Sequence, residues 1–380
     1  MHVSEFYIDR KAMGAFWDFL NDCQGEASNI QTYGVPTIPA GGGALFPKFT
    51  KWHDEMKTRA EERMESVEKA LQGAANSVSG ALDFYNQTED ANAAKLDATY
   101  PGESTKSGLP SQQYQGPNAS NDPPDVNDAY HEFRSSHPSE PLQRTELDTK
   151  ELEPKVSGIE ENLTQLANVL SPYWLITNAI EFILDQVGLD SATVGADTIF
   201  ASFTGNWREW AQATARWQLV GKAYEGLAND LGKSERLELF WRGNASDAAQ
   251  RYFKKLQSAV SAETPYYNDY LVPAYKEVIH VTYDALTVVN NCVQFVVDLA
   301  LTAGISAVVQ TPKLVEAILN AINVISAVIT DYRAFDTRGP MTHWAASRKE
   351  PPCEIQRLRL DEKSYSLPSH GSGHVAGQTS

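Results

Sequence analysis

The sequence predicts an all-α protein in which two helical modules are joined by a disordered linker and followed by a disordered tail. Apolar residues recur at the helical period in both halves, and no segment alternates apolar and polar residues as strands do. Eight of the 19 prolines fall between Pro101 and Pro154, and four more follow Gly339. These two stretches are poor in aliphatic residues, so they bury too little apolar surface to offset the entropy of ordering. The predicted boundaries are 1–100 and 157–338 for the modules, 101–156 for the linker and 339–380 for the tail.

The first module contains one long amphipathic helix, whose apolar positions run from Trp52 to Tyr85 in nine steps over 33 residues. A shorter stripe from Ile8 to Cys23 precedes it, and three consecutive glycines predict a loop between the two helices. Two such helices bury their apolar faces most simply as a hairpin. Because the 52–85 stripe is longer than the first helix, we expect the second module, another copy or a different protein to cover the rest.

The second module shows a near-heptad pattern of apolar positions. Large rings recur every seven residues, at Trp210, Trp217 and Tyr224. The pattern stops before Gly243, a residue that suits the end of a helix. Asn244 with Asp247 is typical of a capping box, which predicts that the next helix begins there. We therefore expect a helix, a tight turn and a second helix, followed by two apolar helices at 276–309 and 313–334.

Composition and motifs exclude several functions. The chain has 32 Lys+Arg against 49 Asp+Glu, a net charge of −17, and no basic cluster, which argues against nucleic-acid binding. Its three cysteines are too far apart for a disulfide framework or a CxxC metal site. None of the common nucleotide-binding, zinc-protease or serine-hydrolase motifs occurs, so we predict no enzyme and no cofactor. His370 and His374 make only a weak two-ligand candidate, so we predict no metal centre.

The stretch from Thr204 to Ala249, with Trp241-Arg242-Gly243 at its predicted turn, resembles the WXG-motif proteins of type VII (ESX) secretion systems. It looks most like the WXG-type helical domains of large actinobacterial secreted proteins. The 1–100 module is similar to the ESX secretion-associated proteins. The resemblance implies a helical hairpin that turns at Trp241 and Gly243.

The same resemblance implies an export signal of the form Tyr-x-x-x-Asp/Glu after a helix. This pattern matches Tyr85 with Glu89 at the end of the first module, and Tyr332 with Asp336 at the end of the second. Residues four apart share one face of a helix, so each pair presents a ring and a charge together to a partner. Two questions stay open: which pair is the signal, and whether Tyr85 simply completes the core stripe.

These features predict a non-enzymatic substrate of a type VII secretion system, which is exported folded and then acts as a binding, scaffold or oligomer-forming protein. Residues 1–20 lack the basic and apolar regions of a signal peptide. We therefore expect synthesis in the cytoplasm and export to the medium or cell surface without cleavage. The expected partners are the secretion ATPase and its machinery, together with a second copy of the chain or a small helical protein.

Two alternatives remain open. Residues 285–330 are apolar around much of the helix circumference, which is typical of a membrane-active or pore-associated protein, although the charges that recur there favour a buried bundle. The other alternative is a targeting module for a toxin on a separate polypeptide, because only 42 residues follow Arg338 and a catalytic domain does not fit there. The first alternative predicts binding to liposomes, and the second predicts a specific co-purifying partner.

Overall fold

The structure is a computed structural model of the 380-residue chain. It describes residues 7–38, 47–87, 131–145, 147–150, 152, 207–281 and 349–362, together with single helical positions between 284 and 327. This part of the chain is mostly helical, in agreement with the predicted all-α class. Within it, no helix is both long and apolar enough to cross a membrane.

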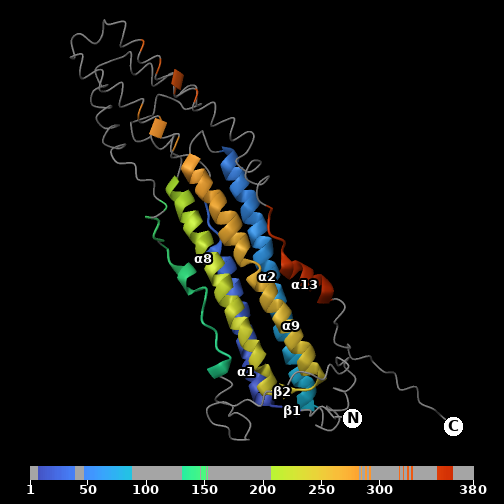
Figure 1. Ribbon diagram of the computed structural model, residues 1–380. Helices are drawn as coiled ribbons and strands as arrows, with labels where there is room; N and C mark the ends of the chain where they lie inside the picture. The colour runs from blue at the N-terminus through green and yellow to red at the C-terminus, as the bar shows by residue number, and fades with distance from the viewer. Residues whose placement is uncertain are drawn as a thin grey trace, which may run out of the picture.

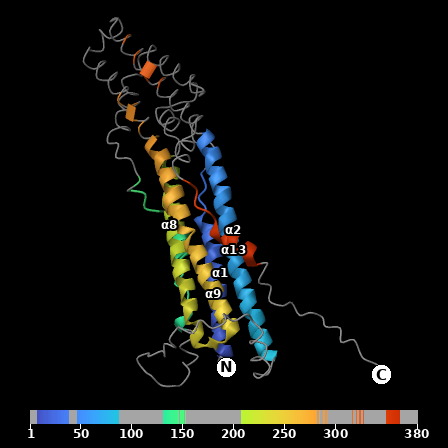
Figure 2. The same cartoon turned by 45° about the vertical axis from the view of Figure 1, so that its right-hand side comes forward.

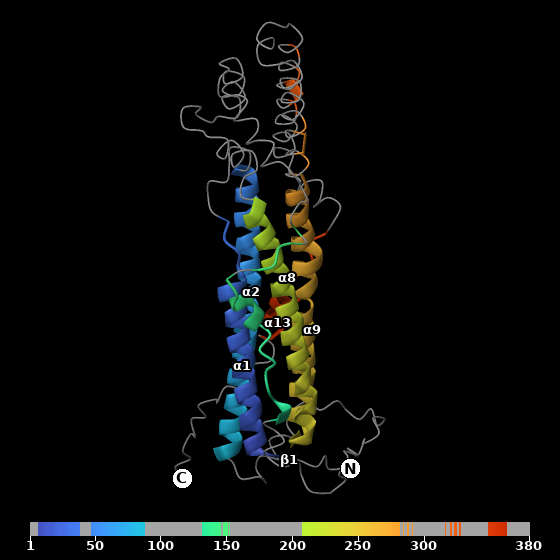
Figure 3. The same cartoon turned by 90° about the vertical axis from the view of Figure 1, so that its left-hand side faces the viewer.

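Long helices run side by side and make an elongated bundle (Figure 1). Their bounds are Arg10–Gly34 for α1, Pro47–Gln87 for α2, Trp207–Leu231 for α8 and Asn244–Ser261 for α9. A π-helical turn, η4 at Tyr266–Leu271, follows α9, and the chain stays helical to residue 281. Helices α1 and α2 form one hairpin, and α8 and α9 form the other, as the view in Figure 3 makes clear.

The two hairpins share one hydrophobic core rather than forming separate cores. The predicted 52–85 stripe lies on α2, and its members are buried except Leu82, which is half-buried. The predicted rings of α8 are buried as well, with Trp217 and Tyr224 fully inaccessible. Residues 207–281, including the helical part beyond α9, therefore contact the face of α2 that α1 leaves open, at Trp210, Trp241 and Glu263. The second module was one of the three covers expected from the sequence.

Helix α1 is longer than the predicted stripe from Ile8 to Cys23, because Ala27 and Ile30 continue the buried face. The helix begins at a side-chain cap, in which Asp9 Oδ1 accepts hydrogen bonds from the backbone N–H groups of Lys11 and Ala12, at 2.9 and 3.0 Å. The buried apolar face of α1 is therefore longer than the sequence indicated.

Parts of both segments expected to be disordered lie against the bundle. In the 101–156 segment, Phe133 and Leu142 are 4% and 1% exposed. In the 339–380 segment, helix α13 at Glu354–Glu362 packs on α2 and α9, with Ile355 fully buried (Figure 2). A few apolar anchors and bundle side chains that bond to the backbone offset the ordering entropy here. Disorder was therefore the wrong prediction for 131–145 and 349–358.

The sequence also predicted no strands, whereas the structure contains a short antiparallel pair. Strand β1, Tyr7–Ile8, pairs with β2, Trp241–Arg242. Each strand has only two residues, too few for a period-2 pattern to be visible in the sequence. The pair ties the beginning of the chain to the predicted helix–helix turn.

Candidate functional site

The predicted turn at Trp241 and Gly243 connects the two helices of the second hairpin. A 3-10 helix, η3 at Gly232–Leu239, follows α8, then β2, and α9 begins directly after Gly243. Gly243 has φ of 130° and ψ of 178°, a conformation that residues with a Cβ rarely adopt. The glycine is therefore required by the backbone at this position.

The start of α9 differs by one residue from the predicted capping box. Gly243, not Asn244, is the N-cap, and its carbonyl accepts the backbone N–H of Asp247 at 3.0 Å. Ser246 adds a side-chain bond, because its hydroxyl donates to the Trp241 carbonyl at 2.6 Å. Bonds across the turn thus hold Trp241 against the first turn of α9.

The N-terminal strand occupies one edge of the turn. Tyr7 is the register partner of Arg242, Ile8 is the partner of Trp241, and the Asp9 N–H donates to the Phe240 carbonyl at 2.7 Å. Partial burial and the Asp9 charge raise the pKa of Tyr7. Arg242 is exposed, whereas Trp241 is only 4% exposed. The Arg242 guanidinium therefore faces solvent at the turn, and the Trp241 ring is buried.

The structure brings Tyr85 to this turn. Tyr85 lies in the last turn of α2, is 5% exposed, and its ring centroid is 6.1 Å from that of Trp241 at an interplanar angle of 76°. This edge-to-face geometry is favourable for aromatic pairs. Figure 1 shows the C-terminal end of α2, the two strands and the start of α1 at one end of the bundle. Glu89, Tyr332 and Asp336, the other predicted export-signal residues, lie outside the described residues.

The chemistry of this end of the bundle suits recognition. Buried rings are covered by a short strand pair, and one exposed guanidinium marks the turn. Within the described ranges, no group of three or more His, Cys, Asp or Glu side chains is placed to hold a metal ion. The candidate metal ligands His370 and His374 lie outside these ranges.

Sequence reasoning missed a buried ion pair between the two hairpins. Arg63 Nε on α2 lies 2.7 Å from Glu263 Oε2 beyond α9, and the two side chains are 6% and 0% exposed. The guanidinium also donates to the carbonyls of Pro351 and Pro352, at 3.0 and 3.3 Å, and stacks 4.0 Å above the Tyr266 ring. Burial raises the pKa of Glu263 despite Arg63. In the sequence, Arg63 is one of several charges on an amphipathic helix, and nothing marks it as buried.

A buried histidine lies among aromatic rings nearer the other end of the bundle. His53 is 1% exposed, and its Nδ1 lies 2.7 Å from the Tyr275 hydroxyl oxygen. The rings of Trp52 and Trp210 stack beside it at 6.2 Å. Burial lowers the pKa of His53 to about 4, so the imidazole is neutral at physiological pH. The contacts of His53 are thus core contacts, with the Tyr275 hydroxyl and the rings of Trp210 and Tyr275.

A scan against protein-family models and searches of curated proteins and of solved structures found no significant match for this chain. The likeness to type VII substrates therefore rests on the sequence motifs.

Proposed function

We propose that the protein is a non-enzymatic substrate of a type VII secretion system, exported in its folded form. The proposal takes α1–α2 as an ESX secretion-associated-type hairpin and α8–α9 as a WXG-type hairpin. The observation that carries it is the contact between Tyr85 and Trp241, because two motifs predicted independently from distant parts of the sequence lie in ring contact. A recognition element of this kind exists only in the folded chain, which suits export of a folded substrate.

The proposed recognition surface combines the end of α2 with the turn before α9. Tyr85 and Trp241 are buried, so they shape the surface from beneath, whereas Arg242 is exposed and available for direct contact. Charged side chains at such a surface steer and orient a partner. We therefore assign Arg242 the direct contact with the secretion machinery and the two rings the positioning of that contact.

Localisation tests the proposal. The chain is expressed in its host with the type VII ATPase intact or inactivated, and its amount in medium and lysate is compared. We expect it in the medium only when the ATPase is active. Retention of the chain in the cytosol of both strains would refute the proposed function.

Two matched variants then test the site. Arg242→Ala removes the exposed charge at the turn, and Arg251→Ala removes an exposed charge on α9 away from it. Both variants are expected to unfold at the same midpoint denaturant concentration as the wild-type chain, because neither guanidinium is buried. Arg242→Ala is expected to lower export several-fold and Arg251→Ala to leave it unchanged. Equal export of the two variants would remove the turn from the recognition surface.

The remaining parts of the proposal follow from the same assignment. The protein would be made in the cytoplasm, leave without cleavage of a signal peptide, and act outside the cell as a binding, scaffold or oligomer-forming protein. The pore-associated alternative depends on residues 285–330, of which only isolated positions are described. No described feature favours it or the toxin-targeting alternative, so secretion of a binding protein is the function carried forward.

A further inference from the structure

An irregular segment, residues 133–145, runs along the groove between α1 and α8, and we refer to it as the strap. Apart from the short 3-10 turn η1 at Glu140–Gln143, its backbone forms no regular structure. Its polar backbone groups therefore need partners elsewhere. Side chains of the bundle supply many of them, which makes the groove chemically specific for an irregular chain segment.

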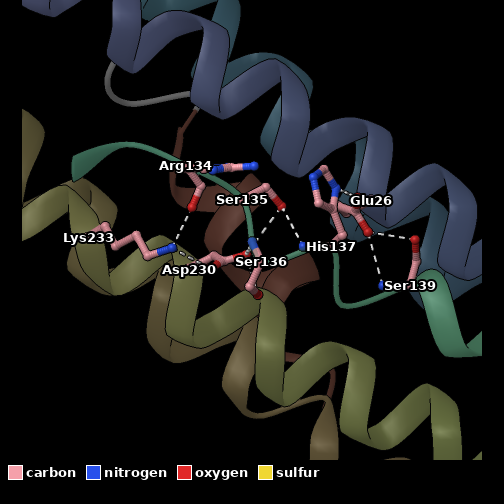
Figure 4. Close-up of polar contacts among 8 residues, drawn as sticks. All are labelled: Glu26, Arg134, Ser135, Ser136, His137, Ser139, Asp230 and Lys233. Carbon is pink, nitrogen blue, oxygen red and sulfur yellow. Dashed lines mark hydrogen bonds and ion pairs between the residues drawn. The ribbon is translucent and has the colours of Figure 1, made fainter. Parts of the chain in front are cut away.

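Asp230 and Lys233 bind the first part of the strap (Figure 4). Asp230 Oδ2 accepts the Ser136 N–H at 2.8 Å and the Ser136 hydroxyl at 3.0 Å. Lys233 Nζ donates to the Arg134 carbonyl and lies 2.7 Å from Asp230 Oδ1. Asp230 is 2% exposed, so this carboxylate is buried with most of its bonds directed at the strap.

Glu26 of α1 binds the middle of the strap from the opposite wall (Figure 4). Its Oε2 accepts the Ser139 N–H at 3.0 Å and the Ser139 hydroxyl, and its Oε1 lies 2.9 Å from His137 Nδ1. Glu26 is 6% exposed. Burial opposes its ionisation, but the hydrogen bonds from Ser139 and His137 outweigh that effect and lower its pKa.

Cationic and amide groups of α8 bind carbonyls in the last part of the strap. Arg216 Nη1 and Nη2 donate to the carbonyls of Leu142 and Arg144, each at 3.3 Å. Gln212 Nε2 donates to the carbonyl of Leu147, just beyond the strap, at 3.2 Å. Along the groove, the bundle thus supplies side-chain acceptors for the N–H groups of the strap and side-chain donors for its carbonyls.

Two buried apolar side chains, the anchors of the strap, and one close contact fix its position in the groove. Phe133 enters a cluster of rings, with its centroid 5.0 Å from Phe16. Leu142 is 1% exposed. Between them Pro138 lies so close to Gly226 of α8 that a Cβ at this glycine would be 2.7 Å from Pro138 Cβ. The groove therefore requires glycine on its wall at the point where the strap crosses it.

From these contacts we propose that the α1–α8 groove is a peptide-binding site, which the strap fills within its own chain. The peptide it accepts has a large aromatic ring at one anchor and a leucine nine positions later, and it makes a tight turn before the leucine. Between the anchors, bundle side chains contact both the backbone and the side chains of Ser135, Ser136, His137 and Ser139, so the site also favours small hydroxyl residues and a histidine there. This proposal does not rest on the export function, although Phe133 of the strap packs 5.9 Å from Phe240, the residue before Trp241.

The strap competes strongly with any added peptide, because it is covalently linked to the groove. A tethered ligand acts at an effective concentration on the order of millimolar. A peptide from another molecule therefore binds measurably only when the strap is weakened. The full chain carrying Phe133→Ala and Leu142→Ala removes both anchors and leaves every groove residue in place.

The test measures binding of a fluorescent peptide with the wild-type sequence of residues 131–147 by anisotropy. We expect the Phe133→Ala/Leu142→Ala chain to bind it at least about tenfold more tightly than the wild-type chain does. Adding Gly226→Ala to that chain is expected to abolish binding through the clash with the peptide proline. Adding Gly25→Ala, a helical glycine with nothing within 4 Å of its Cβ position, is the matched control and leaves binding intact. Absence of binding to the weakened chain, or equal binding with and without Gly226→Ala, would overturn the proposal.

A measurement on the wild-type chain guards against a variant that fails to fold. Hydrogen exchange of the Ser136 and Ser139 amides is expected to be slow in the wild-type chain and about tenfold or more faster in Gly226→Ala, with amides inside α8 unchanged. Exchange of these two amides at the rate of an unstructured peptide in the wild-type chain would show that the groove does not hold the strap, and the proposal would fail.

Discussion

His53 makes the folded protein sensitive to mild acid. The imidazole is 1% exposed and next to the Tyr275 hydroxyl, and burial lowers its pKa to about 4. In the unfolded chain a histidine has a pKa of about 6.5. Because the folded value is the lower one, stability is complete above the unfolded pKa and is lost as the pH falls toward the folded pKa.

The size of the effect follows from the two values. A difference of about 2.5 pKa units corresponds to ~3.4 kcal/mol in total, of which ~2 kcal/mol is already lost at pH ~5. This loss is a large share of the free energy of unfolding of a typical domain, which is roughly 5–15 kcal/mol. Glu26 has a lowered pKa, so its contribution is lost only at more acidic pH. Glu263 has a pKa raised by burial, so its protonation on acidification acts in the opposite direction, and it does so equally in chains with and without His53. The difference in loss between such chains is therefore attributable to His53.

Urea unfolding followed by circular dichroism measures the loss. The wild-type chain, His53→Gln and His280→Gln are each unfolded at pH ~7 and pH ~5. His53→Gln keeps a side chain that can bond to Tyr275 and does not titrate, whereas His280 is exposed and serves as the control. We expect wild type and His280→Gln each to lose ~2 kcal/mol more than His53→Gln does between the two pH values. A loss in His53→Gln equal to that of the wild type would refute the reasoning.

Further predictions concern the ion pair and the turn. Arg63→Met leaves Glu263 buried without its cation and is expected to destabilise the chain by about 3–5 kcal/mol in urea unfolding, whereas Arg63→Met with Glu263→Leu recovers most of that loss. Equal stability of the single and double variants would contradict a buried pair. Gly243→Ala forces a Cβ into a positive-φ conformation and is expected to lower stability by about 1–3 kcal/mol, while Gly25→Ala raises it by up to about 1 kcal/mol. A thermal unfolding scan that ranks these two alanine variants the other way would contradict the assigned turn.

The helices were predictable because their signal is local. The stripe from Trp52 to Tyr85 repeats at a period that only a helix places on one face, and the structure buries it as expected. A turn at Gly243 was likewise predictable from local signals, but its role was not, because the glycine caps the start of α9 and does not end a helix. Neither inference needed any knowledge of which helix packs against which.

The pairing of the hairpins and the ordered strap were not predictable from the same signals. Whether a proline-rich segment is ordered depends on groups far away in the sequence, here Glu26 on one side and Asp230 on the other. Each carboxylate is one of 49 acidic residues, and in the sequence it is indistinguishable from a solvated charge. The contact between Tyr85 and Trp241 was missed for the same reason, because each ring was predicted separately.

The polar contacts between hairpins have a consequence for how the bundle assembles. Apolar stripes on helices are interchangeable to a first approximation, so four amphipathic helices have several ways to pack. Arg63 with Glu263, and the strap held between Glu26 and Asp230, are satisfied in one register only. Any other pairing would leave these groups buried without partners, at a cost of about 1–3 kcal/mol for each lost hydrogen-bond partner and more for the charges. We infer that these charges favour the one arrangement in which Tyr85 meets Trp241.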